Sequence, residues 1–225
     1  MNPIHFDDLG VKDYKETWDM QENILSGMLL DTLAAKYAGH LLFVEHPHVY
    51  TLGKSGNEAN LLISEPLLKQ KGAQFYRINR GGDITYHGPG QLVGYPILRL
   101  DHFGLGLRAY INNLEETIIQ TLSFYNVEAG RLDGATGVWL DTASPSARKI
   151  CAIGVRVSRQ VTMHGFAFNV NTDLSYYNLI NPCGFVDKGV TSLEKELGYT
   201  IDMGSLKKVL LEKLLEVFKA YLIGS

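Results

Sequence analysis

The sequence has little of what marks a secreted, membrane-bound or disordered chain. Its 225 residues include only two cysteines, too few for a disulfide scaffold. No uninterrupted apolar run approaches the roughly 18 residues that a membrane-spanning helix needs. The acidic first ten residues lack the apolar core of a signal peptide. These absences predict a cytoplasmic protein with reduced thiols and no membrane partner.

An excess of charge of one sign is also lacking. The chain has 21 basic and 24 acidic residues and a formal net charge of −3, so we expect no nucleic-acid partner. No internal repeat, low-complexity tract or linker rich in proline and serine divides the chain. The content of 45% hydrophobic and 20% charged residues is typical of a globular protein. We therefore expect a single catalytic domain over residues 1–225.

Apolar residues recur at helical spacing in three segments, which are residues 13–37, 105–124 and 205–222. Ser205 is expected to cap the last of these helices. A shorter helix is expected after Ser64, with Pro66 in its first turn.

Runs rich in β-branched and aromatic residues lie between the helices and predict strands. They cover residues 40–52, 74–79, 91–99, 137–140, 148–158 and 161–170. The strands neither alternate regularly with helices nor form an all-β series. This order predicts an α+β domain in which helices pack on a mixed β-sheet.

The most unusual stretch is RGGDITYHGPGQLVGYP at residues 80–96, with five glycines and two prolines. Glycine lets a ligand lie directly against the main chain. Because Arg80, Thr85 and His87 stand among the glycines, we favour a binding loop over a plain bulged hairpin. The GKS at residues 53–55 lacks the upstream glycine of a Walker A loop, and no GxGxxG opens a helix after a strand.

Both cysteines are candidate nucleophiles. Cys151 lies in the apolar run KICAIGV and shares a strand face with Lys149 by period-two alternation, but a core cysteine beside a lysine at a strand end is the alternative. Cys183 lies in a turn, in INPCGF, where a thiol is accessible. Such a cysteine with a positioned base suits acyl transfer through a thioester, and His87 or His164 could be that base. The seven histidines show no metal-ligand spacing, so no metal or cofactor is expected.

These segments occur together, in this order, in one known family. HPHVYTLGKSG, RGGDITYHGPGQLVGYP, KICAIGV, TMHGFAFNV and INPCGF followed by TSL resemble the lipoyl(octanoyl) transferases from about residue 40 to 193. The resemblance implies a fold related to the catalytic domains of biotin and lipoate protein ligases. It also implies transfer of an octanoyl group from octanoyl-acyl carrier protein to a lysine of lipoyl domains, namely those of 2-oxoacid dehydrogenase complexes and the glycine cleavage H protein.

The same resemblance assigns the site residues. It places the nucleophile on Cys183 rather than Cys151, and its acid/base partner on Lys149. The acyl-substrate contacts fall on three segments, which are Arg80, Gly81, Gly82, Asp83, Ile84, Thr85, Tyr86 and His87; Ala152, Ile153 and Gly154; and Gly165, Phe166 and Ala167.

The residue types suit this chemistry. A free cysteine with a pKa of about 8.5 is mostly protonated at neutral pH, and a desolvated lysine can accept its proton. Small residues at Gly154, Gly165 and Ala167 would leave room for an acyl tail, which gains roughly 0.8 kcal/mol per buried CH₂. Two alternatives remain: an ATP-dependent lipoate or biotin protein ligase, and a non-catalytic protein that binds acyl carrier protein or lipoyl domains.

Overall fold

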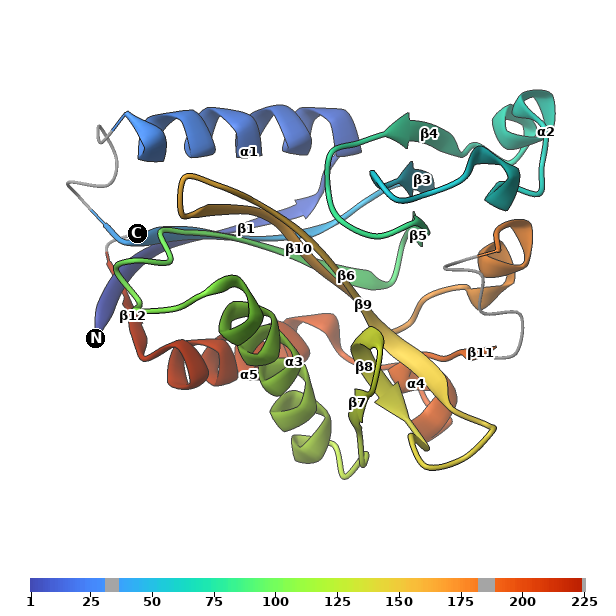
Figure 1. The fold of residues 1–225 in the computed structure, drawn as a ribbon. Helices are drawn as coiled ribbons and strands as arrows, with labels where there is room; N and C mark the ends of the chain where they lie inside the picture. Colours follow the sequence, from blue (N-terminus) through green and yellow to red (C-terminus); the bar gives the residue numbers. More distant parts are fainter. Residues whose placement is uncertain (31–36, 182–188, 224–225) are drawn as a thin grey trace.

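The computed structural model describes residues 1–30, 37–181 and 189–223, which form two β-sheets, with helices on both faces of the larger one (Figure 1). The larger sheet has the order β12-β1-β2-β6-β10-β9-β8-β7, with β11 paired to β9. Its strands are β1 (Asn2–Val11), β2 (Gly39–Glu45), β6 (Gln91–Leu98), β7 (Gly130–Leu132), β8 (Ala135–Leu140), β9 (Arg148–Ser158), β10 (Val161–Asn169), β11 (Gly189–Val190) and β12 (Ala220–Leu222). Strand β1 pairs in parallel with β2 and β12, whereas the run from β2 to β7 is antiparallel. The sheet is therefore mixed, as predicted.

The smaller sheet contains the predicted binding loop at its edge. Its strands are β3 (Val49–Leu52), β4 (Gln74–Arg77) and β5 (Ile84–His87), in the order β4-β3-β5. The short helices η1 (Glu58–Asn60) and α2 (Glu65–Gln70) lie between β3 and β4 in the chain. The predicted strand over residues 40–52 is thus two strands in different sheets. The chain leaves the first strand just before Pro47, which has no N–H to donate to a strand ladder.

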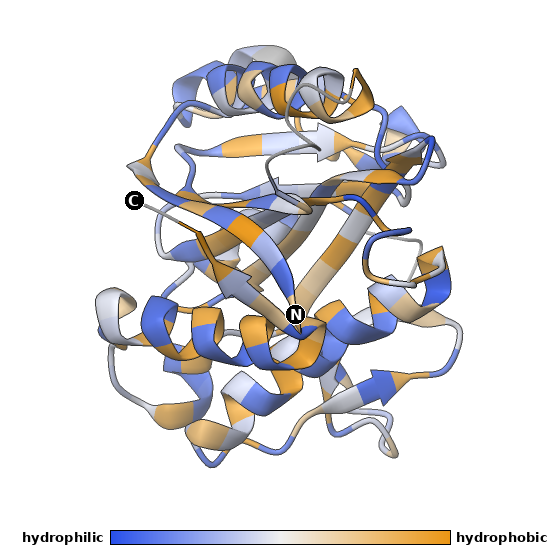
Figure 2. Cartoon of the chain, turned by 90° about the vertical axis from the view of Figure 1, so that its left-hand side faces the viewer, coloured by the Kyte–Doolittle hydropathy of each residue, from blue (hydrophilic) through white to orange (hydrophobic). Residues whose placement is uncertain are grey.

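Three long helices bury their apolar faces against the larger sheet. Helix α1 (Tyr14–Leu29) covers one face, and α3 (Leu107–Phe124) and α5 (Met203–Phe218) cover the other (Figure 1). Figure 2 shows apolar and hydrophilic residues alternating along these helices, as expected for helices with one buried face. Two shorter helices, η2 (Leu174–Leu179) and α4 (Leu193–Leu197), flank β11 in the chain. None of the helices in the described ranges is long and apolar enough to cross a lipid bilayer.

Helix boundaries differ from the predictions at two places. The last helix begins earlier than expected because Asp202, not Ser205, is its N-cap, with Asp202 Oδ2 accepting the Ser205 N–H at 2.7 Å. It ends at Phe218, and the left-handed backbone of its C-cap, Lys219 (φ 50°), turns the chain into β12. The first helix ends at Leu29, and residues 31–36 of the predicted segment lie outside the described residues.

Candidate active site

A cavity of about 410 Å³ lies where β6, β9 and β10 of the larger sheet meet β5 of the smaller one. Small residues form a column across β9 and β10, because Gly154 pairs with Gly165 and Ala152 with Ala167. All four line the cavity. The cavity therefore has one stretch of wall without bulky side chains.

Most of the predicted substrate contacts surround this cavity. Its lining includes Arg80, Gly82, Asp83, Ile84, Thr85, His87, Lys149, Ala152, Ile153, Gly154, Gly165, Phe166 and Ala167. Two predicted contacts do not line it. The Gly81 N–H donates to the backbone oxygen of Val155 at 3.0 Å, and the buried Tyr86 hydroxyl lies 2.7 Å from His48 Nδ1. These two residues support the lining rather than form it.

Cys183 lies outside the described residues, but the chain on either side of it is attached to the cavity wall. Tyr177 and Gly189 both line the cavity. Strand β11 pairs in parallel with the start of β9, so that Val190 stands opposite Lys149. Described residues on both sides of this segment therefore line the cavity, and Val190, which follows it, lies beside Lys149.

Lys149 packs against an aromatic ring. Its Nζ is 4.6 Å from the ring centroid of Trp139, a buried residue whose indole N–H donates to the Ala135 carbonyl oxygen at 2.9 Å. A desolvated contact of this kind stabilises the charged amine by up to about 2 kcal/mol. Gly137 (φ 119°) lets β8 pass close to β9 beside this lysine, since a Cβ there would lie 2.5 Å from the carbonyl oxygen of Cys151. The buried carboxylate of Glu115 accepts the Gly137 N–H at 3.0 Å and so fixes this turn of the backbone.

A directional series of hydrogen bonds begins at the predicted binding loop. The buried Arg80 donates from Nη2 to the carbonyl oxygen of Thr51 at 2.7 Å and to its Oγ1 at 3.0 Å. Thr51 Oγ1 is 3.4 Å from His87 Nε2, and His87 Nδ1 is 2.8 Å from Gln91 Oε1. An amide oxygen only accepts, so Nδ1 carries the hydrogen and Nε2 accepts from the Thr51 hydroxyl. Burial lowers the pKa of His87 to about 3, which keeps the ring neutral at pH 7.

The same series continues to the chain that follows β11. Gln91 Nε2 donates to Asn169 Oδ1 at 2.9 Å, and Asn169 Nδ2 donates to the carbonyl oxygen of Thr191 at 3.0 Å. The Tyr177 hydroxyl also donates to Asn169 Oδ1, at 3.2 Å. Fully satisfied buried networks rigidify the groups they join. This network therefore fixes the binding loop relative to the segment after Cys183.

His164 occupies a strained position on the cavity wall. It has left-handed backbone (φ 61°), which is uncommon for a residue with a side chain. Its backbone N–H donates to Gln21 Oε1 at 3.1 Å and its Nε2 donates to Asn79 Oδ1 at 3.0 Å. Burial, assisted by Arg80, lowers its pKa to about 3. His164 is therefore neutral at pH 7 and has only Nδ1 left to accept a proton.

Cys151 does not meet the requirements of a nucleophile. Its side chain is buried in the core under α3 and α5 and does not line the cavity. Burial also raises the pKa of its thiol, whereas a reactive cysteine needs access and a favoured thiolate. The structure supports the alternative interpretation, a core cysteine.

Several cavity residues were not singled out from the sequence. They are Tyr14, Val93, Tyr95, Gly134, Ala135, Thr136, Trp139, Asn169, Tyr177, Gly189 and Val190. Five of them lie within predicted helices or strands, where an inward-facing side chain has no signal that separates a cavity wall from the core, and the other six lie in segments for which no element was predicted. The three tyrosine hydroxyls and the indole are the exceptions, because such groups need polar partners when buried.

Comparisons with known proteins agree with this geometry. The family model described as the lipoyl protein ligase A/B catalytic domain matches residues 13–215. An octanoyltransferase from Christiangramia forsetii is 57% identical over 222 residues, which cover 95% of each chain. The solved bipartite lipoate protein ligase of Thermoplasma acidophilum superposes with a TM-score of 0.71 at 14% identity, over 99% of this chain and 85% of that one. The biotin protein ligase of Aquifex aeolicus gives a TM-score of 0.55 at 13% identity, over 96% and 70% of the two chains.

The mixed sheet with its helices has the fold of the lipoate and biotin protein ligase catalytic domains. This likeness confirms the predicted α+β fold. Within this class, the chain belongs to the lipoyl protein ligase A/B catalytic domain family, and its curated relatives at 50–57% identity are octanoyltransferases. It is therefore an acyltransferase, as the resemblance predicted.

Proposed function

We propose that this enzyme transfers an octanoyl group from octanoyl-acyl carrier protein to a specific lysine of lipoyl domains, through a thioester on Cys183. Lys149 acts as the acid and base. The proposed acceptors are the lipoyl domains of 2-oxoacid dehydrogenase complexes and the glycine cleavage H protein. The observation that carries the proposal is the position of Lys149, which lines the cavity and stands opposite Val190, in the strand that follows Cys183.

The cavity suits an apolar acyl tail. Ala152, Gly154, Gly165 and Ala167 give it a wall of small residues, and the apolar Val93 of β6 also lines it. Each buried CH₂ of the tail gains roughly 0.8 kcal/mol. A tail that fills the cavity is therefore favoured over one that is shorter by several carbons.

The first half of the reaction moves the acyl group onto the enzyme. Lys149 accepts the thiol proton of Cys183, and the thiolate attacks the carbonyl carbon of the octanoyl thioester. The new C–S bond to Cys183 forms as the C–S bond to phosphopantetheine breaks. The departing thiolate takes the proton back from Lys149. The charged state of Lys149 in between is the one that the Trp139 ring stabilises.

The second half moves the acyl group onto the acceptor. The amine of the lipoyl-domain lysine attacks the acyl-enzyme carbonyl carbon and loses a proton to Lys149. The amide C–N bond forms, the C–S bond to Cys183 breaks, and Lys149 returns the proton to the thiolate. Atoms and charges balance without ATP, an oxidant or a metal ion.

Intact-protein mass spectrometry tests this proposal. The protein is incubated with octanoyl-acyl carrier protein and no ATP, and we expect one added octanoyl group that tryptic mapping places on Cys183. Addition of a lipoyl domain should then discharge it. Cys183→Ser should form no thioester, whereas the matched variant Cys151→Ala should behave as the parent protein.

The alternatives give different results in the same assay. An acyl group on another side chain, or full transfer activity in Cys183→Ser, would contradict Cys183 as the nucleophile. Transfer only in the presence of ATP would support the ligase mechanism. Binding of the carrier protein without any mass increase under turnover conditions would support a non-catalytic role.

A further inference from the structure

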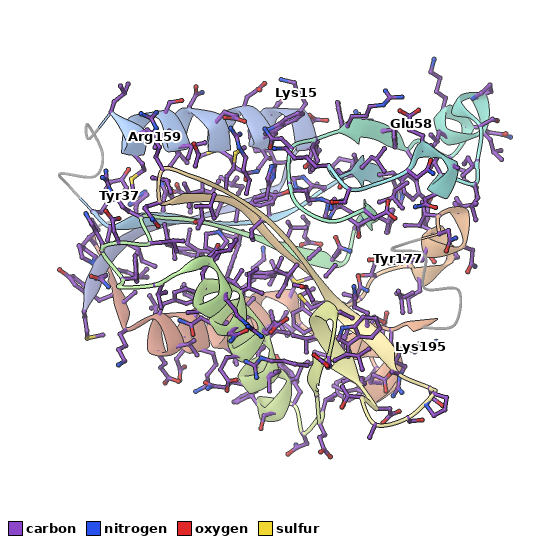
Figure 3. The ribbon with its side chains drawn as sticks, in the orientation of Figure 1. Lys15, Tyr37, Glu58, Arg159, Tyr177 and Lys195 are labelled. Atoms are coloured by element: carbon purple, nitrogen blue, oxygen red, sulfur yellow. The ribbon has the colours of Figure 1, made fainter. Side chains whose placement is uncertain are left out.

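We propose that His5, Asp7 and His40 form a binding site for a divalent transition-metal ion, with zinc as the best match. The three residues lie on β1 and β2, away from the proposed active site. Tyr37, whose ring is about 6 Å from both histidine rings, marks the place in Figure 3, where it lies near one end of the sheet while the cavity residue Tyr177 lies toward the other.

The parallel pairing of β1 and β2 brings the three donors together. His5 and Asp7 are two residues apart on β1 and so share a face of the sheet. The register places His40 directly opposite His5. The alternate residues, Phe6 and Leu41, belong to the core under α3 and α5, so the three donors lie on the face that α1 covers. One ligand atom from each donor lies within 4.8 Å of the other two.

One of the distances between these atoms is already that of a metal site. His5 Nε2 is 3.5 Å from Asp7 Oδ1, whereas His40 Nε2 is hydrogen-bonded to Asp7 Oδ2 at 2.6 Å, and this distance has to lengthen when an ion enters. Ligand atoms about 2.0–2.2 Å from a tetrahedral zinc stand about 3.4 Å apart. The side chains of His5 and Asp7 are 32% and 36% exposed, so they can rotate toward a shared ion, whereas His40 is only 9% exposed and stays fixed.

Among the described residues, His40 makes its hydrogen bond within this cluster. Its Nδ1 is buried and has no hydrogen-bond partner in the described part of the chain, whereas its Nε2 faces Asp7. Nε2 is therefore the His40 atom that is placed to bind an ion shared with His5 and Asp7.

The donor set selects the class of ion. Two imidazole nitrogens and one carboxylate suit zinc, cobalt, nickel and copper, whereas magnesium and calcium prefer sites built from oxygen. Three protein ligands leave a fourth position for water. No metal was expected from the spacing of the histidines, because His5 and His40 are 35 positions apart in the sequence and only the strand pairing brings them together.

A bound ion would join β1 to β2 and so stabilise this end of the sheet. Strand β1 also carries the short β12 on its other side, so the same ion would hold the last described strand in place indirectly. An ion that binds only the folded chain raises the midpoint of thermal unfolding. Its removal is not expected to change the acyl transfer reaction, since none of its ligands lines the cavity.

Metal titration of the full chain tests this inference. The experiment uses the Cys183→Ser background, so that the thiol cannot bind the ion, and a chelator-treated sample titrated with Zn²⁺ by calorimetry and with Co²⁺ by visible absorbance. We expect one equivalent to bind, intense tetrahedral Co²⁺ bands, and a higher unfolding midpoint with Zn²⁺ but not with Mg²⁺.

Two ligand variants and one control decide the outcome. His5→Ala and Asp7→Asn, both on partly exposed side chains, should each weaken Zn²⁺ binding at least about tenfold, or about 1.4 kcal/mol. His102→Ala removes an exposed histidine elsewhere and should bind as the parent does. Equal affinity in His5→Ala, or no Zn²⁺ binding by the parent, would overturn the proposal. Neither result bears on the Cys183 thioester, which is measured separately.

Discussion

The lysine proposed as acid and base owes its position to neighbours on α3 and β8. Gly137 lets β8 approach β9 beside Lys149, Glu115 fixes the backbone of Gly137, and Trp139 faces the amine. A lysine is rarely buried without a partner, and the aromatic face of Trp139 is one partner of Lys149. The reactivity of the Cys183 thiol should therefore depend on Trp139.

Replacing Trp139 with leucine tests this dependence. We expect the alkylation rate of Cys183 to rise at a higher pH than in the parent, because the charged lysine that favours the thiolate loses up to about 2 kcal/mol of stabilisation. The value of kcat/KM should fall by roughly tenfold. Trp139→Phe keeps an aromatic face and should shift the profile less. If the two variants lose activity with an unchanged alkylation profile, the role of Trp139 is only structural.

At the scale of strands and helices, the pairing of β6 with β10 depends on glycine. A Cβ at Gly165 would lie 2.2 Å from the carbonyl oxygen of Gly94, a distance that real contacts do not reach. Because that oxygen belongs to the backbone, the strands must separate to accept any side chain. The glycine in TMHGFAFNV is thus required by the sheet as well as by the cavity.

The substitution Gly165→Ala should lower the free energy of unfolding by about 1–3 kcal/mol, which is the usual cost of overpacking a core site. Urea denaturation measures it. The matched control is Gly204→Ala in α5, where a Cβ meets only Asp202 Oδ2 at 3.5 Å; helix propensity should make that variant about 0.5–1 kcal/mol more stable. Equal stability of Gly165→Ala and the parent would show that the strands can yield.

The same scale explains which elements the sequence predicts. The stripe over residues 105–124 predicts α3 to within two residues, because a helix with one apolar face carries its own signal. Strand β1 was missed because Asp7 and Asp8 hide its alternation and its pairing with β2 is a long-range contact. The binding loop was found from its glycines, whereas Asn169 and Val190 reach the cavity only through strand pairing and have no local signal.

For the whole molecule, the arrangement of buried histidines sets the response to acid. Burial lowers the pKa of His46 to about 4 and that of His87 and His164 to about 3. The same histidines in the unfolded chain titrate at about 6.5. Between these values the unfolded chain binds protons that the folded chain does not, so acid favours unfolding. The contribution of these histidines to the free energy of unfolding is therefore fully present above about pH 6.5, and it is lost as the pH falls toward 4.

Each such histidine changes the free energy of unfolding by up to about 1.4 kcal/mol per pH unit in this window. His46→Gln isolates one of them, since an amide can reproduce the bond that His46 Nδ1 donates to the Lys12 carbonyl oxygen and the one that Nε2 accepts from the Tyr95 hydroxyl. Urea unfolding at pH 5 and pH 6 should show a smaller difference for His46→Gln than for the parent, whatever the variant's absolute stability. His102→Ala, an exposed site, should keep the parent's difference. A parent-like pH dependence in His46→Gln would mean that His46 takes up its proton over the same pH range in the folded and the unfolded chain. The pH dependence of the parent's stability would then come from other groups, such as His87 and His164.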